Sequence, residues 1–170
     1  MFDWLKRDTA NKEAARRWRD AVTAEARSPE PYLKGWATDT IYGRFNMVAL
    51  VATLAMRRLR AEGREGQKLS KAFSELLFSD FDHALRENGV GDASIARRIR
   101  KMGEEFFGLA KAVDEALEMT RPQSAVADVL RRNIQPDQDK AMQLADHIII
   151  LSERVDQLSD TVILSGPDAI

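Results

Sequence analysis

The chain has 170 residues, of which 44% are hydrophobic and 31% are charged, and its formal net charge is −1. This length and composition are typical of a soluble globular protein, so we expect a single domain over residues 1–170. Because the net charge is close to zero, the total charge does not point to nucleic acid or to an anionic membrane as a partner. The absence of cysteine excludes disulfides, thiolate catalysis and cysteine-based metal sites.

The sequence contains no segment that is expected to cross a membrane. The longest nearly unbroken apolar run, Met47 to Met56, is half as long as the ~20 residues that a span needs. The N-terminal residues include several acids and lack the apolar run of a signal peptide. We therefore expect a cytoplasmic location, with peripheral contact at the inner face of the membrane as an alternative.

Apolar residues recur at helical spacing along most of the chain, which predicts an all-α bundle of about six helices. The first helix is expected from Thr9 or Asn11 to Ala26, because Pro29 and Pro31 follow it. Ahead of this helix lie three large apolar side chains, those of Phe2, Trp4 and Leu5. They predict either a staple onto the core or an anchor for a membrane or a partner protein.

The second predicted helix is the most hydrophobic one. It runs from about Thr40 to Ala61, with Thr38 or Asp39 as its cap, and its apolar residues predict burial on most sides. A polar loop is expected over Glu62–Lys68, followed by a third helix at about Ser70–Asn88.

Three further helices are predicted in the second half of the chain. One starts at Asp92 or Ser94 and ends near Met119, and two glycines inside it, Gly103 and Gly108, indicate the close approach of a neighbouring helix. A short helix at Ser124–Asn133 precedes the last and longest helix, at about Asp137–Leu164. The last helix carries a coiled-coil-like apolar seam, which predicts either packing on the other helices or a homodimer through this helix.

Three polar residues on the third helix are candidates for a metal site. Asp80, His83 and Glu87 follow spacings of three and four, so they share one helix face, but three ligands on one helix leave a metal sphere incomplete. We therefore expect no metal there. A carboxylate on an apolar face needs a partner, and Arg44 on the buried second helix is the predicted partner of Asp80 or Glu87.

The end of the third helix resembles a tight corner. Gly89 is placed to adopt a left-handed conformation after Asn88, and Gly91 is expected to help the next helix fold back. Asp82 and Arg86 are spaced for a weak surface ion pair.

Catalysis finds little support in the sequence. It contains neither a nucleophile elbow nor a glycine-rich phosphate loop, so we expect no enzyme activity and no cofactor. Two basic clusters are visible, Arg57, Arg58, Arg60 and Arg64, and Arg97, Arg98, Arg100 and Lys101. They predict either solvated helix faces or contact with ribosomal RNA or anionic lipid.

Two stretches of the chain resemble the signatures of a known family. Asp39–Met47 reads DTIYGRFNM and is similar to DTxxGRFDM, and Phe78–Asp92 reads FSDFDHALRENGVGD and is similar to FxDMDxxLREMGVGD. Both signatures belong to the ubiquinol–cytochrome c chaperone family of mitochondria and alphaproteobacteria. The resemblance covers about Ala26 to Met119, and the short N-terminus is typical of a bacterial member.

The resemblance implies an all-helical, non-enzymatic chaperone for assembly of ubiquinol–cytochrome c reductase, the respiratory complex III. Mitochondrial members bind newly made cytochrome b near the ribosome exit, together with a small partner protein, so these are the expected partners. The alternative is a general helical interaction module, or a dimer, without a respiratory client.

Structural and client-binding candidates follow from the two stretches. The residues concerned are Asp39, Arg44, Phe45, Asp80, Asp82, Arg86, Glu87, Gly89, Gly91 and Asp92. A chaperone also needs apolar surface that its core does not use. The candidates for that surface are Phe2 and Trp4, Tyr32 and Trp36, and Ile149 and Ile150.

Overall fold

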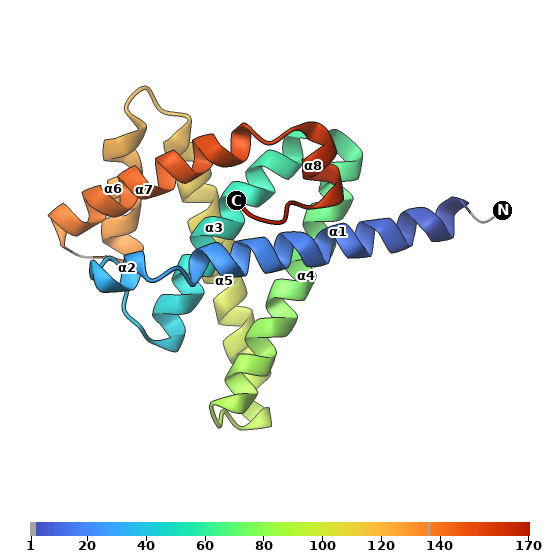
Figure 1. The fold of residues 1–170 in the computed structure, drawn as a ribbon. Helices are drawn as coiled ribbons and strands as arrows, with labels where there is room; N and C mark the ends of the chain where they lie inside the picture. The colour runs from blue at the N-terminus through green and yellow to red at the C-terminus, as the bar shows by residue number, and fades with distance from the viewer. Residues whose placement is uncertain (1–2, 136) are drawn as a thin grey trace.

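The computed structural model describes residues 3–135 and 137–170, with side chains described from Asp8 onward. The described part is built from α-helices and contains no strand, so the predicted all-α class is confirmed (Figure 1). The helices are α1 (Asp3–Ala26), α2 (Glu30–Leu33), α3 (Ile41–Ala61), α4 (Gly63–Glu87), α5 (Asp92–Leu117), α6 (Pro122–Asn133), α7 (Gln138–Asp156) and α8 (Asp160–Ser165). None of these helices combines the length and hydropathy that a membrane span would need.

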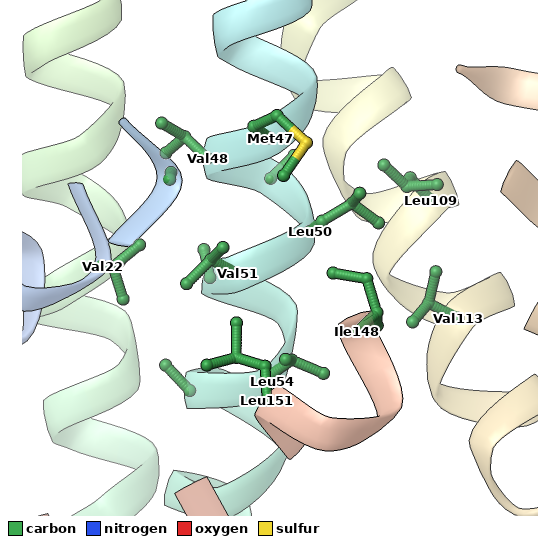
Figure 2. Packing of buried hydrophobic residues seen from close by; sticks show 14 of the residues in the cluster. Val22, Met47, Val48, Leu50, Val51, Leu54, Leu109, Val113, Ile148 and Leu151 are labelled. Atoms are coloured by element: carbon green, nitrogen blue, oxygen red, sulfur yellow. The ribbon is translucent and has the colours of Figure 1, made fainter. Parts of the chain in front are cut away.

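Helix α3 is the centre of the fold, as its hydrophobic sequence predicts. It packs against α1, α4, α5, α7 and α8, and its apolar side chains are buried around most of its circumference. Figure 2 shows Leu50 and Leu54 of α3 among side chains from the neighbouring helices, including Ile148 and Leu151 of α7. Burial of about 25 cal/mol per Å² of apolar surface makes this cluster the main source of stability.

The start of the first helix differs from the sequence expectation. Helix α1 begins at Asp3 rather than at Thr9 or Asn11. Phe2 and the side chains of Trp4 and Leu5 lie outside the described residues, so their predicted roles stay predictions.

The predicted loop over Glu62–Lys68 is wrong. Helix α4 begins at Gly63, whose φ of +65° reverses the chain within about one residue of the end of α3. Gly66 lies so close to α3 that an added Cβ would come within 1.9 Å of the Leu59 carbonyl oxygen. The polar residues of this segment therefore form the solvent side of a first helical turn instead of a loop.

The predicted single C-terminal helix is also wrong. Helix α7 ends at Asp156, and Ser159 starts α8 by accepting a hydrogen bond from the Val162 amide. The break turns α8 onto α1, where the Trp18 indole Nε1 donates to the Ile163 carbonyl at 2.9 Å. The longest helix is α5, with 26 residues.

The apolar seam of the last predicted helix is buried inside the chain. Its core members are Ala141, Leu144, Ile148, Leu151 and Val155, each at most 1% exposed. Because α7 packs these side chains against α6 and α3, the first of the two predicted alternatives, packing on the other helices, is what the structure shows, and a homodimer through this helix stays a prediction. Ile150 is 57% exposed and Ile149 is half-buried.

The glycines inside α5 do not mark a close helix–helix approach. A Cβ added to Gly103 would make an ordinary contact with the Phe78 ring at 3.7 Å, and one added to Gly108 would meet nothing within 4 Å. Neither position lies on the buried face of α5, so the predicted close approach is wrong.

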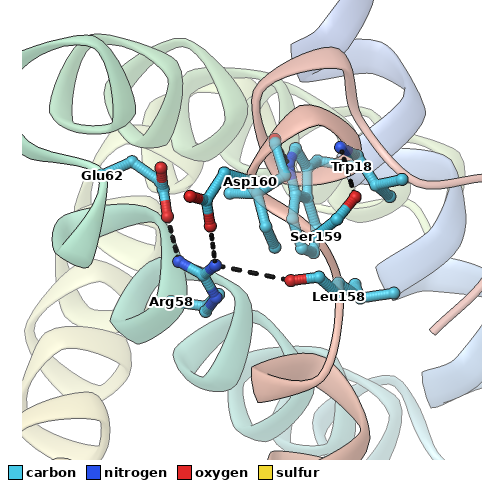
Figure 3. A network of polar contacts seen from close by, with 8 residues as sticks. Trp18, Arg58, Glu62, Leu158, Ser159 and Asp160 are labelled. Atoms are coloured by element: carbon cyan, nitrogen blue, oxygen red, sulfur yellow. Dashed lines mark hydrogen bonds and ion pairs between the residues drawn. The ribbon is translucent and has the colours of Figure 1, made fainter.

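A polar network ties the end of α3 to the turn between α7 and α8 (Figure 3). The Arg58 guanidinium bonds Glu62, donates to Asp160 at 2.8 Å and donates to the Leu158 carbonyl at 3.4 Å. Burial disfavours the charge of Arg58, yet the hydrogen bonds to Glu62 and Asp160 raise its pKa above the ordinary value.

The first basic cluster is therefore engaged within the fold. Arg57 and Arg60 both bond the carboxylate of Asp114 on α5. These three arginines hold helices together, and contact of this cluster with RNA or lipid stays a prediction.

Candidate functional site

A groove of about 600 Å³ opens between the C-terminal end of α1, the N-terminal end of α3 and the second half of α4. Its lining consists of Thr23, Arg27, Asp39, Thr40, Ile41, Arg44, Phe45, Val48, Leu77, Asp80, Phe81, Ala84, Leu85, Glu87, Asn88 and Met102. We call this surface the α1–α3–α4 groove. An adjoining hollow of about 490 Å³ continues it along α1 and α4, past Arg19, Asp20 and His83.

The first signature-like stretch builds the α3 wall of the groove. Thr40 is the N-cap of α3, in place of the predicted Thr38 or Asp39, and its Oγ1 accepts from the Gly43 amide at 3.1 Å. Phe45, on the buried face one turn further along, packs edge-on against Phe81 of α4 with ring centroids 4.9 Å apart. This aromatic pair brings together the two signature-like stretches, which are far apart in the sequence.

Gly43 is required by a close approach of the backbone. It is buried in the first turn of α3, and a Cβ at this position would lie 1.8 Å from the Thr38 carbonyl oxygen. Only a residue without a side chain lets the segment before α3 fold back across the helix. That segment carries Asp39 to the rim of the groove.

The predicted ion pair between Arg44 and Asp80 or Glu87 is wrong. Arg44 Nε instead donates to Asp39 Oδ1 at 2.7 Å, and Arg19 of α1 reaches Asp80 at 3.5 Å. The expectation rested on burial of the carboxylates, but Asp80 is 44% exposed at its side chain and Glu87 is exposed. Exposure removes the desolvation cost that would have forced the pairing.

Local electrostatics follow from these partners. The hydrogen bond to Asp39 raises the pKa of the Arg44 guanidinium above its ordinary value. The same guanidinium lies 6.0 Å from the centre of the Tyr32 ring. Burial raises the pKa of the Tyr32 hydroxyl, and the nearby charge of Arg44 works against that shift.

The second signature-like stretch has two structural roles. Asp80, Phe81 and Glu87 line the groove, whereas the residues after them form the turn between α4 and α5. At that turn Arg86 bonds Asp82 of its own helix at 2.7 Å and also bonds Asp92 of α5. The bond to Arg86 lowers the pKa of Asp82, and the predicted surface pair is thereby confirmed.

The glycines of this turn are not equivalent. Gly89 has φ +76°, as its predicted left-handed role requires, while Gly91 has φ −65° and serves as the N-cap of α5. Neither Asp92 nor Ser94 provides the predicted side-chain cap. Of the two glycines in this turn, only Gly89 therefore needs the conformational freedom of glycine.

Replacing Gly89 with alanine is expected to lower the free energy of unfolding by about 1 kcal/mol, since the added Cβ has open space but the backbone is left-handed. Urea denaturation measures the change. Gly91→Ala is the matched control and is expected to change stability by less than about 0.5 kcal/mol. Equal losses for both variants would contradict the role given to φ at Gly89.

The ten predicted site residues divide between two places. Asp39, Arg44, Phe45, Asp80 and Glu87 lie in the groove lining. Asp82, Arg86, Gly89, Gly91 and Asp92 lie at the α4–α5 turn, which ends a pair of helices that projects from the rest of the fold in Figure 1. Within residues 3–135 and 137–170, no group of three or more acidic or histidine side chains is arranged to hold a metal ion.

Several groove residues escape prediction from the sequence. Thr23 and Arg27 at the end of α1 line both hollows, and Ile41 of α3 lines the groove with a side chain that is 38% exposed. No local pattern marks the two α1 residues, because their position depends on how α1 crosses α4. For Ile41, the signal available was an apolar residue directly after the helix cap Thr40.

The aromatic pair predicted as free apolar surface is used by the fold. Trp36 is 4% exposed, and its indole donates to Gln143 of α7 at 3.0 Å. The Tyr32 hydroxyl donates to the Ala26 carbonyl at 2.8 Å and its ring packs on the core. Both side chains therefore anchor the segment between α1 and α3, which corrects the prediction.

The sequence profile of the family described as ubiquinol-cytochrome C chaperone matches residues 37–168. The chain belongs to the ubiquinol–cytochrome c chaperone family. The match includes both signature-like stretches and continues through α8, so the helices after Met119 are part of what this chain shares with its family.

A solved structure supports the same relationship. The protein in the crystal structure of the Cbp3 homolog from Brucella abortus is 28% identical to this chain, with a TM-score of 0.85. The alignment covers 98% of this chain and 93% of that chain. No curated protein is similar enough in sequence to count as a relative.

Proposed function

We propose that this protein is a non-enzymatic assembly chaperone of ubiquinol–cytochrome c reductase, and that the α1–α3–α4 groove holds a segment of newly made cytochrome b. The observation that carries the proposal is the convergence of the two signature-like stretches on one groove. Their residues Phe45 and Phe81 meet at its base, and Arg44 and Glu87 stand on its rim.

The groove has the surface properties that a holding chaperone needs. Its base is apolar, formed by side chains such as Val48 and Phe81, and the exposed apolar side chain of Ile41 extends it. Apolar surface left open in this way favours binding of another apolar chain. A volume of about 600 Å³ suits a few side chains of a client rather than a whole folded subunit.

The proposal places the protein in the cytoplasm, at the inner face of the membrane and close to the translating ribosome, with a small partner protein. Arg97, Arg98 and Arg100 support this part because they are exposed and form no ion pair with the residues that the structure describes. Anionic lipid or RNA phosphates are the groups that such arginines attract.

Site-specific crosslinking in the source organism tests the client. A photo-reactive amino acid is introduced at Ala84, which lines the groove, and separately at Leu164 on α8, which is 41% exposed outside it. Cytochrome b is expected to be captured from Ala84 and not from Leu164.

Two results would contradict the proposal. One is a deletion strain that keeps normal levels of assembled reductase. The other is capture of cytochrome b equally from both positions, which would show that the groove does not select the client. Capture of unrelated proteins only would favour the general interaction module.

A further inference from the structure

We infer that the α4 wall of the α1–α3–α4 groove recognises a cationic side chain, so that the segment bound there is an apolar stretch flanked by lysine or arginine. The inference rests on the proposed function for the identity of the client, and on the charges of the groove for its chemistry. It concerns Asp80 and Glu87, which both line the groove and its adjoining hollow.

Glu87 carries a charge that the fold leaves uncompensated. It is exposed, and its side chain makes no ion pair or hydrogen bond within the described part of the chain. It is also the last residue of α4, where the partial negative charge of the helix end disfavours a carboxylate. A carboxylate in this position gains from an external cation.

Asp80 is only weakly neutralised. Its contact with Arg19 measures 3.5 Å, and the same guanidinium bonds Asp20 at the much shorter distance of 2.6 Å. Asp80 precedes Glu87 by two helical turns on the same wall, which separates them by about 10 Å along the axis. Cations spaced about three residues apart on an extended peptide could reach both.

The position of these acids beside apolar surface defines the kind of segment. Between the two carboxylates lies Ala84, and Phe81 and Leu77 form the base of the groove below them. An apolar chain on this base would bring its flanking residues to the acidic wall. Membrane proteins carry such an arrangement at the cytoplasmic ends of their spanning helices, where lysine and arginine follow an apolar run.

The opposite wall of the groove has the opposite charge. Arg27 at the end of α1 is exposed, and no ion pair with it occurs in the described residues. Arg44 is already bonded to Asp39. The groove and its adjoining hollow together are lined by three arginines, Arg19, Arg27 and Arg44, and by four carboxylates, those of Asp20, Asp39, Asp80 and Glu87, so negative charge exceeds positive charge by one.

Peptide binding to the purified full-length chain tests the inference. The probes are a fluorescein-labelled apolar peptide flanked by arginines and the same peptide flanked by glutamates, compared by fluorescence anisotropy at low and high salt. The wild-type chain is expected to prefer the arginine peptide, with a preference that shrinks at high salt.

Variants of the wall make the test specific. Glu87→Gln is expected to weaken binding of the arginine peptide about threefold to fivefold, and Asp80→Asn combined with Glu87→Gln about tenfold. Glu104→Gln is the matched control, because Glu104 is another exposed helical glutamate that pairs with no described residue, and it lies outside the groove lining. It is expected to leave binding unchanged. Circular dichroism verifies that each variant keeps its helix content.

Three outcomes would overturn the inference. They are equal affinity for both peptides, preference for the glutamate peptide, which would assign recognition to Arg27, and no binding of either peptide. The proposed function fails separately: a chain that prefers the arginine peptide through Asp80 and Glu87 but does not capture cytochrome b in cells would retain this chemistry with another client.

Discussion

Gly43→Ala is expected to lower the free energy of unfolding by about 2–4 kcal/mol and to disrupt the α1–α3–α4 groove. The new Cβ would fall 1.8 Å from the Thr38 carbonyl oxygen, so the segment before α3 must move. That movement would separate Thr40 from the Gly43 amide that it caps and displace Asp39 from Arg44. Urea denaturation gives the stability, and crosslinking from Ala84 gives the state of the groove.

Gly108→Ala is the control for this experiment. It makes the same chemical change inside a helix, at an exposed position where the Cβ meets nothing within 4 Å. The helix propensity of alanine is then expected to raise stability by about 0.5–1 kcal/mol. If Gly43→Ala were as well tolerated as Gly108→Ala, the close approach of the Thr38 backbone would not be the reason for glycine in the signature.

Arg58→Met is expected to cost about 2–4 kcal/mol of stability, because it leaves the Glu62 carboxylate without its buried partner. The side chains of Arg58 and Glu62 are each only 13% exposed. The same change removes the bonds to Asp160 and to the Leu158 carbonyl, which hold the α7–α8 turn against α3. Thermal and urea denaturation both report the loss.

Arg60→Met provides the comparison for Arg58. Arg60 bonds Asp114 at 2.6 Å, but its side chain is 45% exposed. An exposed ion pair of this kind contributes less than about 1 kcal/mol. A loss for Arg58→Met no greater than that for Arg60→Met would mean that the buried network does not stabilise the C-terminal turn.

Local sequence patterns were reliable where a single helix decides the outcome. Helical spacing of apolar residues predicted the all-α class and the central place of α3, and the position of Gly89 predicted a left-handed residue, which φ +76° confirms. The i,i+4 spacing of Asp82 and Arg86 predicted their pair. Each of these features depends on interactions between residues close together in the chain, so the local sequence is enough to predict it.

Predictions failed where the outcome depended on chain direction or on exposure. The segment after Ala61 was expected to be a loop, but Gly63 reverses the chain so sharply that helix resumes at once. Asp80 and Glu87 were expected to need Arg44, but they stand on an open groove wall where water solvates them. Polarity alone does not distinguish an exposed helical turn from a loop, or a groove wall from a buried face.

The sequence by itself determined the helices, the signature-like stretches and, through them, the family of this protein. Only the tertiary structure decided that these stretches form one groove, because Phe45 and Phe81 meet through the crossing of α3 and α4. It also decided that α1 supplies Thr23 and Arg27 to that groove, although α1 lies outside both stretches. The physical reason is that a helix sets which residues share its face, whereas packing between helices sets which faces meet.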